Sequence, residues 1–468
     1  MTPLLRIAWR NLARNRRRSA ATIGSIAIGA AAMLCFGQFV AQTVLEFQTG
    51  VVRNTGHLAV FRKGYYDFGG GNPAAYGISG YPALIAAIER DPELGPRLAV
   101  VTPRIDLNGV AGNFRIGASK TFFGAGVVPS DFTRMRQWDG YRLFERDPVL
   151  TTGLDPADPN VGVVGVGVAR ILGLCGELHV ANCPAPPVAV GPETTGPAPD
   201  LDLADLARRD APQGAAANAT NATIDLLTAT ASGAPNVATL RIAAAESQGI
   251  RELDDNYVRL HFDLAQQLLY GRTEPRAVSI VIQLKRTQDL AAAKARLETL
   301  IAERGLELEV RDFRELNPFY AQGSQFLTSL FVFMAIIMGV IVLFTVVNTM
   351  SMTVLERTHE IGAARSMGWR RSAIRWQFIL EGVMLGGLGV AAGLVAAQAL
   401  GVLINLLHIR IVLPGSAQGS ELRLLTNMEV VPLMLGVSAG LLVMAVAAAF
   451  APANRAARML IVDALRHV

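Results

Sequence analysis

The residues best placed to do chemistry form a charged segment that follows a long uncharged run. No Asp, Glu, Lys or Arg occurs in 316–355, a run longer than the roughly 20 apolar residues that cross a bilayer. Four charged residues then follow within ten positions: Glu356, Arg357, Glu360 and Arg365. On a helix, Glu356 and Glu360 share one face, while Val354 and Ile361 lie close together on another. The pattern predicts a charged amphipathic segment that binds a partner surface at one side of a membrane; an ordinary basic loop is the competing interpretation.

This segment resembles the one that follows the second membrane helix in FtsX-like and MacB-like permeases of ABC transporters. Family members read Asn-x-Met, then Val-x-Glu-Arg-x-x-Glu-Ile-Gly-x-x-Arg-x-x-Gly. Ten positions match: Asn348, Met350, Val354, Glu356, Arg357, Glu360, Ile361, Gly362, Arg365 and Gly368. In the family, the segment is a coupling element that touches a separate ATPase. The resemblance therefore implies ATPase-coupling roles for Val354, Glu356, Arg357, Glu360, Ile361, Gly362 and Arg365. Val354 and Ile361 are expected to pack into an apolar groove on the ATPase.

The composition is that of a membrane protein. The chain has 468 residues, of which 51% are hydrophobic and 17% charged, whereas soluble proteins carry about 25% charged residues. The net charge of +5 could indicate nucleic-acid binding. However, aromatic residues are sparse and the arginines sit beside apolar runs, which is typical of membrane topology signals, so no nucleic-acid partner is expected.

The apolar runs predict four membrane-spanning helices. They are transmembrane helix 1 at 19–45, a stalk and helix 2 at 316–355, helix 3 at 377–407 and helix 4 at 430–454. The first could instead be a secretory signal peptide, whose apolar core is only about 7–15 residues and ends in a small-residue cleavage site. Residues 19–45 form a longer run with no clear site before Glu46, which favours an uncleaved helix.

The arginines set the predicted orientation. Arginine-rich parts are the basic N-terminus 1–18, the coupling segment 356–376 and the C-terminus 455–468. The short loop 408–429 holds only Arg410 and Arg423. Because Lys and Arg favour the cytoplasmic side, both termini and 356–376 are predicted to be cytoplasmic, with 46–315 and 408–429 outside. The chain is expected to be a multi-pass protein of the inner (plasma) membrane.

Residues 46–315 are long enough for one or two packed domains. Strand–helix–strand patterns occur near both ends of this segment, at 56–62, 82–90 and 98–102 and again at 278–284, 291–304 and 306–310. They predict an α+β domain built from the two ends. Between them, 110–128 and 161–168 are rich in Gly and Val and predict a second, mostly β subdomain. The segment is similar to the extracytoplasmic domain of MacB-like permeases, best at 249–255 and 265–269.

Residues 174–223 depart from the family pattern. Family members have a short turn here, whereas this chain has Cys175, Cys183 and a stretch rich in Pro, Ala, Gly and Asp, a composition that predicts mobility. On an oxidising side of the membrane, a disulfide between Cys175 and Cys183 is the natural pairing. A metal site with His179 is the alternative, but no Cys-x-x-Cys spacing supports it.

A catalytic role is not expected. A P-loop needs Gly-Lys-Ser/Thr, and the nearest piece, 112–121, separates Gly117 from Lys120. The sequence has no His-Glu-x-x-His pair, and no uncharged run carries an internal acid or base for an ion relay. No catalytic, cofactor-binding or metal-binding residue is predicted, so energy must enter from another polypeptide that binds the ATP.

The third predicted helix carries a run of small residues: Gly382, Gly386, Gly387, Gly389 and Gly393. Small residues at such spacing let helices approach closely. The stripe can form a contact between two copies or pack within one copy, and the sequence leaves both open.

The predicted fold class is an α-helical membrane protein with four transmembrane helices plus an α+β extracytoplasmic domain inserted between helices 1 and 2. The resemblance implies an ABC transporter permease of the MacB, lipoprotein-release and FtsX type, in which a cytoplasmic ATPase drives conformational change outside (mechanotransmission). It implies a dimer with a second or homologous permease, contact with membrane lipids, and a periplasmic carrier or adaptor for lipoprotein release or export of a hydrophobic substrate. A non-transporting regulator of a cell-wall hydrolase or peptide sensor, and a receptor without an ATPase, stay open as alternatives.

Overall fold

The computed structural model describes residues 3–14, 16–144, 152–180, 222–249, 251–271, 275–411 and 420–461. The chain separates into two compact units. The helical unit takes Met1–Gln48, Phe319–Ile411 and Ser420–Val468, and the sheet unit is built mainly from Thr49–Pro318. Each unit has its own core, so each is described by itself.

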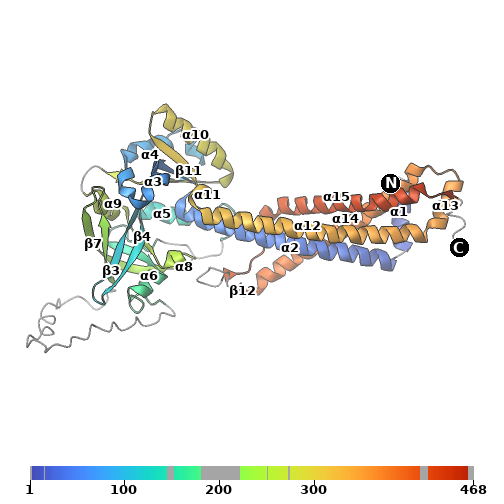
Figure 1. The fold of residues 1–468 in the computed structure, drawn as a ribbon, viewed down its shortest axis with the longest axis horizontal. Helices are drawn as coiled ribbons and strands as arrows, with labels where there is room; N and C mark the ends of the chain where they lie inside the picture. Colours follow the sequence, from blue (N-terminus) through green and yellow to red (C-terminus); the bar gives the residue numbers. More distant parts are fainter. Residues whose placement is uncertain are drawn as a thin grey trace, which may run out of the picture. The chain divides into compact units, whose positions relative to one another are not determined.

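Four helices in the described part of the chain are long and apolar enough to cross a membrane. They are α2 (Arg16–Thr55), α12 (Pro318–Glu356), α14 (Arg371–Leu407) and α15 (Val431–Arg458), and within the helical unit they run side by side (Figure 1). Helices α2 and α14 begin before 19 and 377, the predicted starts of their spans. Their first turns are rich in Arg and Ala, which favour helix and extend it beyond the apolar stretch.

The glycine stripe of α14 packs within one copy of the chain. A Cβ placed at Gly382, Gly386, Gly389 or Gly393 would come within 2.5–2.6 Å of a neighbouring side chain. The neighbours of the first two belong to α15, and those of the last two belong to α2. Of the two alternatives that the sequence left open, close packing inside the subunit therefore accounts for these four glycines.

Two short helices lie at one end of the helical unit. Helix α1 (Pro3–Arg14) packs against α14, and α13 (Thr358–Ser366) follows the end of α12. Figure 1 shows α1 and α13 at the same end of the four long helices. The two ends of the described chain therefore lie beside the segment that links α12 to α14.

The first part of the sheet unit combines the two ends of its chain segment. The elements are β1 (Leu58–Arg62), α4 (Tyr81–Glu89), β3 (Leu98–Asn113), β10 (Ser279–Leu284), α10 (Leu290–Glu303) and β11 (Leu308–Asp312). The strands lie in the antiparallel order β11–β1–β10–β3. Buried residues of α4 and α10, including Ile88 and Leu297, pack with Val60 and Ile280 of the sheet. The predicted α+β architecture is confirmed.

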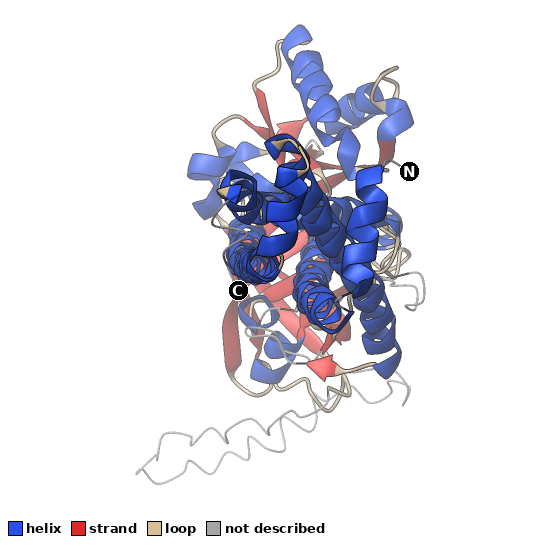
Figure 2. Cartoon of the chain, turned by 90° about the vertical axis from the view of Figure 1, so that its right-hand side faces the viewer, coloured by secondary structure: helices blue, strands red, loops and turns tan. Residues whose placement is uncertain are grey.

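The second part of the sheet unit is a closed ring of strands. It uses β3 again with β4 (Ala118–Val127), β5 (Val161–Gly165), β6 (Thr223–Ala229), β7 (Pro235–Glu246) and β8 (Tyr257–His261). Among the described strands, the pairing runs β3–β4–β8–β5–β7–β6 and returns to β3. Leu107, Phe122, Leu226 and Ile242 belong to its apolar core. The expected mostly β subdomain is therefore a small closed sheet, whose strands are red in Figure 2.

Two neighbouring strands of the sheet unit continue into the two long helices. Helix α2 ends at Thr55 and β1 begins at Leu58, while β11 is followed by α11 (Phe313–Leu316) and then α12. Strands β1 and β11 pair directly. The Phe313 N–H donates to the His57 carbonyl at 3.0 Å, and the Asn317 amide donates to the Thr55 hydroxyl at 3.4 Å. The chain thus enters and leaves the sheet unit at one hydrogen-bonded junction.

Candidate coupling site

The charged segment folds as a short helix between two turns. Arg357 has a non-helical backbone (φ −105°, ψ 17°) and separates α12 from α13. At the other end, Gly368 has a φ of 91°, a left-handed conformation that favours glycine. The Trp369 N–H donates to the Ala364 carbonyl and the Gly368 N–H to the Arg365 carbonyl, both at 3.1 Å. This is a Schellman arrangement, and it explains why a glycine stands at 368.

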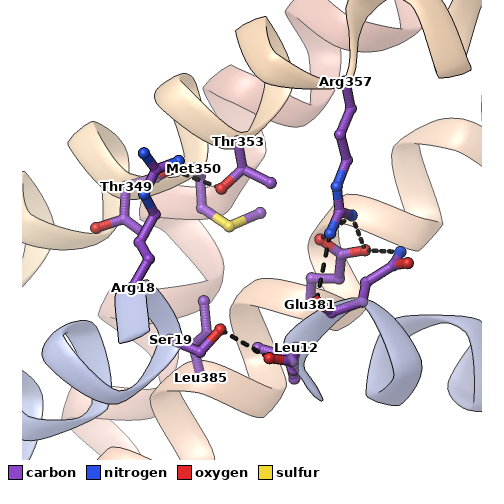
Figure 3. Close-up of a pocket in the computed structure, with 10 residues that line it drawn as sticks. Leu12, Arg18, Ser19, Thr349, Met350, Thr353, Arg357, Glu381 and Leu385 are labelled. Atoms are coloured by element: carbon purple, nitrogen blue, oxygen red, sulfur yellow. Dashed lines mark hydrogen bonds and ion pairs between the residues drawn. The ribbon is translucent and has the colours of Figure 1, made fainter. Parts of the chain in front are cut away.

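Arg357 and Glu381 form a buried ion pair at the centre of the site. Their side chains are 6% and 4% exposed, and the Arg357 Nη1 lies 3.0 and 3.3 Å from the two carboxylate oxygens. The Asn11 side-chain amide donates to Glu381 at 2.5 Å, while the Arg357 Nη2 donates to the Asn11 carbonyl at 3.4 Å. The cluster joins α1, α14 and the turn between α12 and α13 (Figure 3).

A small cavity adjoins this ion pair. It holds about 20 Å³ and is lined by residues of α1, α2, α12 and α14 around Arg357 and Glu381 (Figure 3). Among the described residues, the Arg357 Nε finds no hydrogen-bond partner. A polar cavity of this size can hold about one water molecule. The pair is therefore firmly bonded on the carboxylate side and loosely packed on the other.

Two exposed ion pairs tie the segment to the N-terminal helices. Arg14 lies 2.6 Å from Glu360, and Arg18 lies 2.5 Å from Glu356. All four side chains are at least one third exposed, and such surface pairs contribute only about 0–1 kcal/mol each. They fix the register of α13 against α1 and α2 more than they stabilise it.

The structure buries Val354 and Ile361 within the chain itself, and their contact with a groove on the ATPase stays a prediction. Their side chains are 4% and 6% exposed and belong to the core of the helical unit, together with Ile374 and Phe378 of α14. Ile361 is buried because α13 folds back on the helix bundle and covers its own apolar face, and Val354 is buried near the end of α12. Gly362 and Arg357 are also buried, so these residues hold the segment against its own chain.

The exposed side of the segment carries a different set of residues. They are Leu355, Glu356, His359, Glu360, Met367 and Trp369. Met367 is 74% exposed and Trp369 is 37% exposed, on either side of Gly368. Sequence reasoning missed these two; an apolar residue on each side of a helix-ending glycine was the available signal. Arg365 is half-buried and donates to the Ala457 carbonyl at 2.9 Å, which ties α13 to the end of α15.

The predicted disulfide falls at the edge of the described chain. Cys175 lies after α6 (Val166–Ile171), but Cys183 belongs to 181–221, which lies outside the described residues. The pairing of Cys175 with Cys183 stays a prediction. Within the ranges given above, no three His, Cys, Asp or Glu side chains come close enough together to hold a metal ion.

The described chain combines four helices that are long and apolar enough to cross a membrane with a charged segment between the second and third. Residues 331–461 match the family model of the FtsX-like permease C-terminal domain, a range that includes every predicted coupling residue. Over this range the chain is similar to FtsX-like and MacB-like ABC transporter permeases, and this similarity and the apolar helices support a multi-pass protein of the inner membrane.

Curated relatives agree with this family over part of the chain. The macrolide export ATP-binding/permease protein MacB of Escherichia coli is 32% identical over 29% of this chain and 21% of its own length. The ABC transporter permease YtrF of Bacillus subtilis is 30% identical over 29% of this chain and 31% of its own. The pyoverdine export protein PvdT of Pseudomonas syringae pv. tomato is 28% identical over 44% of this chain and 29% of its own. The chain thus matches less than a third of the length of each relative.

Proposed function

We propose that this chain is the permease subunit of an ABC transporter and transmits the work of a separate cytoplasmic ATPase to its extracytoplasmic domain. The observation that carries the proposal is the buttressed segment after α12. Its buried residues, led by Arg357, fix it to α1 and α14, while Met367 and Trp369 remain exposed at its end. A push on the exposed face would therefore move α12 as a lever.

The junction in the sheet unit supplies the other end of this lever. Helix α12 begins at Pro318, six residues after β11 ends at Asp312, and β11 pairs with β1, which follows α2. Movement of α12 along or around its axis would load this strand pair directly. We therefore propose α12 and α2 as the two arms of mechanotransmission.

The proposed ATPase contact uses the exposed residues of the segment, with Met367 and Trp369 as apolar anchors. A large exposed apolar residue gains about 1.5–3 kcal/mol on full burial in an interface. Rim charges such as Glu356 and Glu360 contribute less and set orientation. This assignment replaces Val354 and Ile361, whose burial makes them supports of the contact and not part of it.

Co-purification from membranes tests the proposal. Met367→Asp combined with Trp369→Ala should abolish recovery of the ATPase and leave the amount of folded permease unchanged. Met428→Asp is the matched control, because Met428 is 83% exposed and lies far from the segment in the sequence. Undiminished recovery of the ATPase with the double variant, together with full function in a deletion strain, would sink the proposal.

The remaining partners and the orientation are part of the same proposal. Helix α12 is the most apolar of the four long helices described, and most of its apolar stretch is not buried within the chain, so its outer face needs lipid or a second permease. A hydrophobic cargo fits the macrolide export named for one relative, and release of a lipoprotein with a periplasmic carrier or adaptor is the other form of this proposal. Ser232→Cys should react with an impermeant maleimide in intact cells, and Ser366→Cys only after the membrane is broken. The reverse labelling would refute the orientation.

A further inference from the structure

Helix α1 presents a cationic surface of which only Arg14 contacts the coupling segment in the described chain. Arg6, Arg10 and Arg14 are spaced four residues apart and therefore share one face of α1. All three are exposed, and Trp9, beside them, is 53% exposed. Arg16 and Arg17, the first residues of α2, are exposed as well. We define these five arginines and Trp9 as the basic face.

The opposite face of α1 is already occupied by the chain itself. Ala8 is fully buried, Leu12 packs on the core of the helical unit, and Asn11 bonds to Glu381. The helix is therefore held against the bundle by its apolar side, and only its basic face is free to meet something else. Helix α2, the first candidate membrane-spanning helix, begins two residues after α1 ends, so its proposed membrane location puts the basic face near the lipid headgroups.

The charges of the basic face are mostly unneutralised. In the described chain, Arg6, Arg10, Arg16 and Arg17 have no acidic partner, whereas Arg14 pairs with Glu360. Clusters of four or more arginines beside a membrane helix attract anionic headgroups at about 1 kcal/mol per residue. A tryptophan at the flank of such a cluster suits the same layer, since its ring is amphipathic.

We propose that the basic face binds the headgroups of anionic phospholipids, and that this binding competes with the ion pairs that hold the coupling segment. Arg14 and Arg18 each have two possible acceptors: a lipid phosphate, or Glu360 and Glu356. A more anionic membrane draws these arginines toward the headgroups and loosens α13. The inference rests on the proposed membrane location of α2 but not on ATPase coupling.

The test measures lipid retained by the full chain. Purified protein in detergent is titrated with dioleoyl phosphatidylglycerol, with dioleoyl phosphatidylcholine, or with inorganic phosphate, and the bound lipid is quantified by mass spectrometry after size exclusion. The wild-type chain should retain phosphatidylglycerol preferentially, and phosphate at the same concentration should compete only weakly. Replacing Arg6, Arg10, Arg16 and Arg17 with Gln should raise the half-saturating phosphatidylglycerol concentration on the order of tenfold or more.

A matched control removes the same charge elsewhere. The variant Arg62→Gln/Arg90→Gln/Arg251→Gln/Arg304→Gln alters four exposed arginines of the sheet unit and should leave lipid retention unchanged. Equal loss in both quadruple variants would reduce the effect to net charge and overturn the site. Efficient competition by inorganic phosphate would show that the basic face binds anions without specificity for lipid. If the quadruple variant of the basic face lost the ATPase but kept its lipid retention, the basic face would instead bind an acidic protein surface.

The competition itself has a separate readout. Glu356→Gln combined with Glu360→Gln frees Arg14 and Arg18, so phosphatidylglycerol should half-saturate this variant at a concentration several-fold lower than wild type. A spin label at His359 should also become more mobile in phosphatidylglycerol nanodiscs than in phosphatidylcholine nanodiscs. No gain in lipid affinity in the double variant would overturn the link to the coupling segment. Failed ATPase co-purification, in contrast, would leave both lipid results intact.

Discussion

Each unit of the described chain buries an arginine, and the two arginines are held in different ways. In the sheet unit, Arg259 is 1% exposed. Its guanidinium donates to Glu246 at 2.9 Å, to the Thr152 carbonyl at 3.3 Å and to the Tyr257 hydroxyl at 3.3 Å. It also lies 4.7 Å from the centre of the Phe132 ring. Arg259 is therefore held by three hydrogen-bond partners and an aromatic ring, and it crosslinks strands to helix α5 (Pro129–Arg136).

In the helical unit, Arg357 has fewer partners. It shares Glu381 with Asn11, leaves its Nε without a partner among the described residues, and borders the cavity of about 20 Å³. An arginine held by three partners and a ring resists rearrangement, whereas one beside a cavity has room to change rotamer. The comparison shows that a buried arginine can act either as a fixed crosslink or as an adjustable contact. Arg259 is the fixed crosslink, and Arg357 is the adjustable contact that attaches the coupling segment.

The largest expected effect on stability comes from breaking the buried ion pair between Arg357 and Glu381. Arg357→Met leaves Glu381 buried without a cationic partner in the described chain, a change that typically costs 3–5 kcal/mol. We expect the apparent free energy of unfolding to fall by about that amount. The measurement is a denaturant titration of the full chain in detergent.

A double variant separates the lost charge pair from the lost packing. Arg357→Met with Glu381→Leu removes both charges and should recover most of the stability lost in the single variant. Coupling of the double variant to the ATPase should stay impaired, because the contact between Arg357 and Glu381 that attaches the segment is still missing. A double variant as unstable as the single one would contradict the role assigned to the stranded carboxylate.

The second effect on the free energy of unfolding concerns Arg259 in the sheet unit and should be smaller. Arg259→Met leaves Glu246 paired with Arg136, whose guanidinium lies 3.1 Å from the carboxylate. The loss is then mainly of two further hydrogen bonds and the ring contact, about 2 kcal/mol in all. A denaturant titration of this variant in detergent measures the loss. A larger loss for Arg259→Met than for Arg357→Met would reverse the comparison between the two sites.

The third effect is a pH dependence at the junction of the sheet unit. His57 is fully buried, its Nδ1 accepts from the Leu284 N–H at 3.0 Å, and its Nε2 lies 3.1 Å from the Thr287 hydroxyl. Burial lowers the pKa of His57 from 6.5 to about 3. Because the unfolded chain takes up the proton first, this contribution to stability is complete above pH 6.5 and is lost as the pH falls toward 3. The expected slope is about 1.4 kcal/mol per pH unit.

Trp138 provides the signal for this measurement. Its ring lies 5.0 Å from the His57 ring, so unfolding of the junction should change tryptophan fluorescence. The full chain in detergent is unfolded at several pH values between about 4 and 7, an interval that includes the ordinary pKa of histidine. In His57→Gln the slope over this interval should flatten. An unchanged slope in that variant would assign the acid sensitivity to another group.

Much of the fold could be predicted from the sequence because its signals are local. Uncharged runs predict the long helices, and alternating apolar residues predict β1, β10 and β11 within a few residues. The closed ring of strands could not be predicted, because the pairing of β3 with β6 joins residues more than a hundred positions apart. Strand pairing at that distance leaves no periodic trace in the chain.

The candidate site was predicted in position but not in orientation. The motif places the segment correctly after α12, yet a helix with two possible contact faces does not reveal which one turns inward. The apolar face of α13 is covered by the bundle of its own chain, so Ile361 is buried and Trp369 is exposed. The pairing of Arg357 with Glu381 was likewise hidden, since 24 residues separate them.

The smallest effect is expected at the exposed ion pairs, and it tests whether burial decides the comparison. Arg14 and Glu360 lie 2.6 Å apart, closer than the buried pair at 3.0 Å, but their side chains are 58% and 55% exposed. Water and salt screen such a pair, so a double-mutant cycle with Arg14→Gln and Glu360→Gln should give a coupling energy below about 1 kcal/mol. Raising the salt concentration should reduce it further, whereas the Arg357–Glu381 coupling should hardly change. A coupling above about 2 kcal/mol for the exposed pair would mean that distance outweighs burial here. Helix α1 would then be rigidly attached to the coupling segment. Lipid headgroups could not break the pair between Arg14 and Glu360, and the proposed lipid competition would not occur.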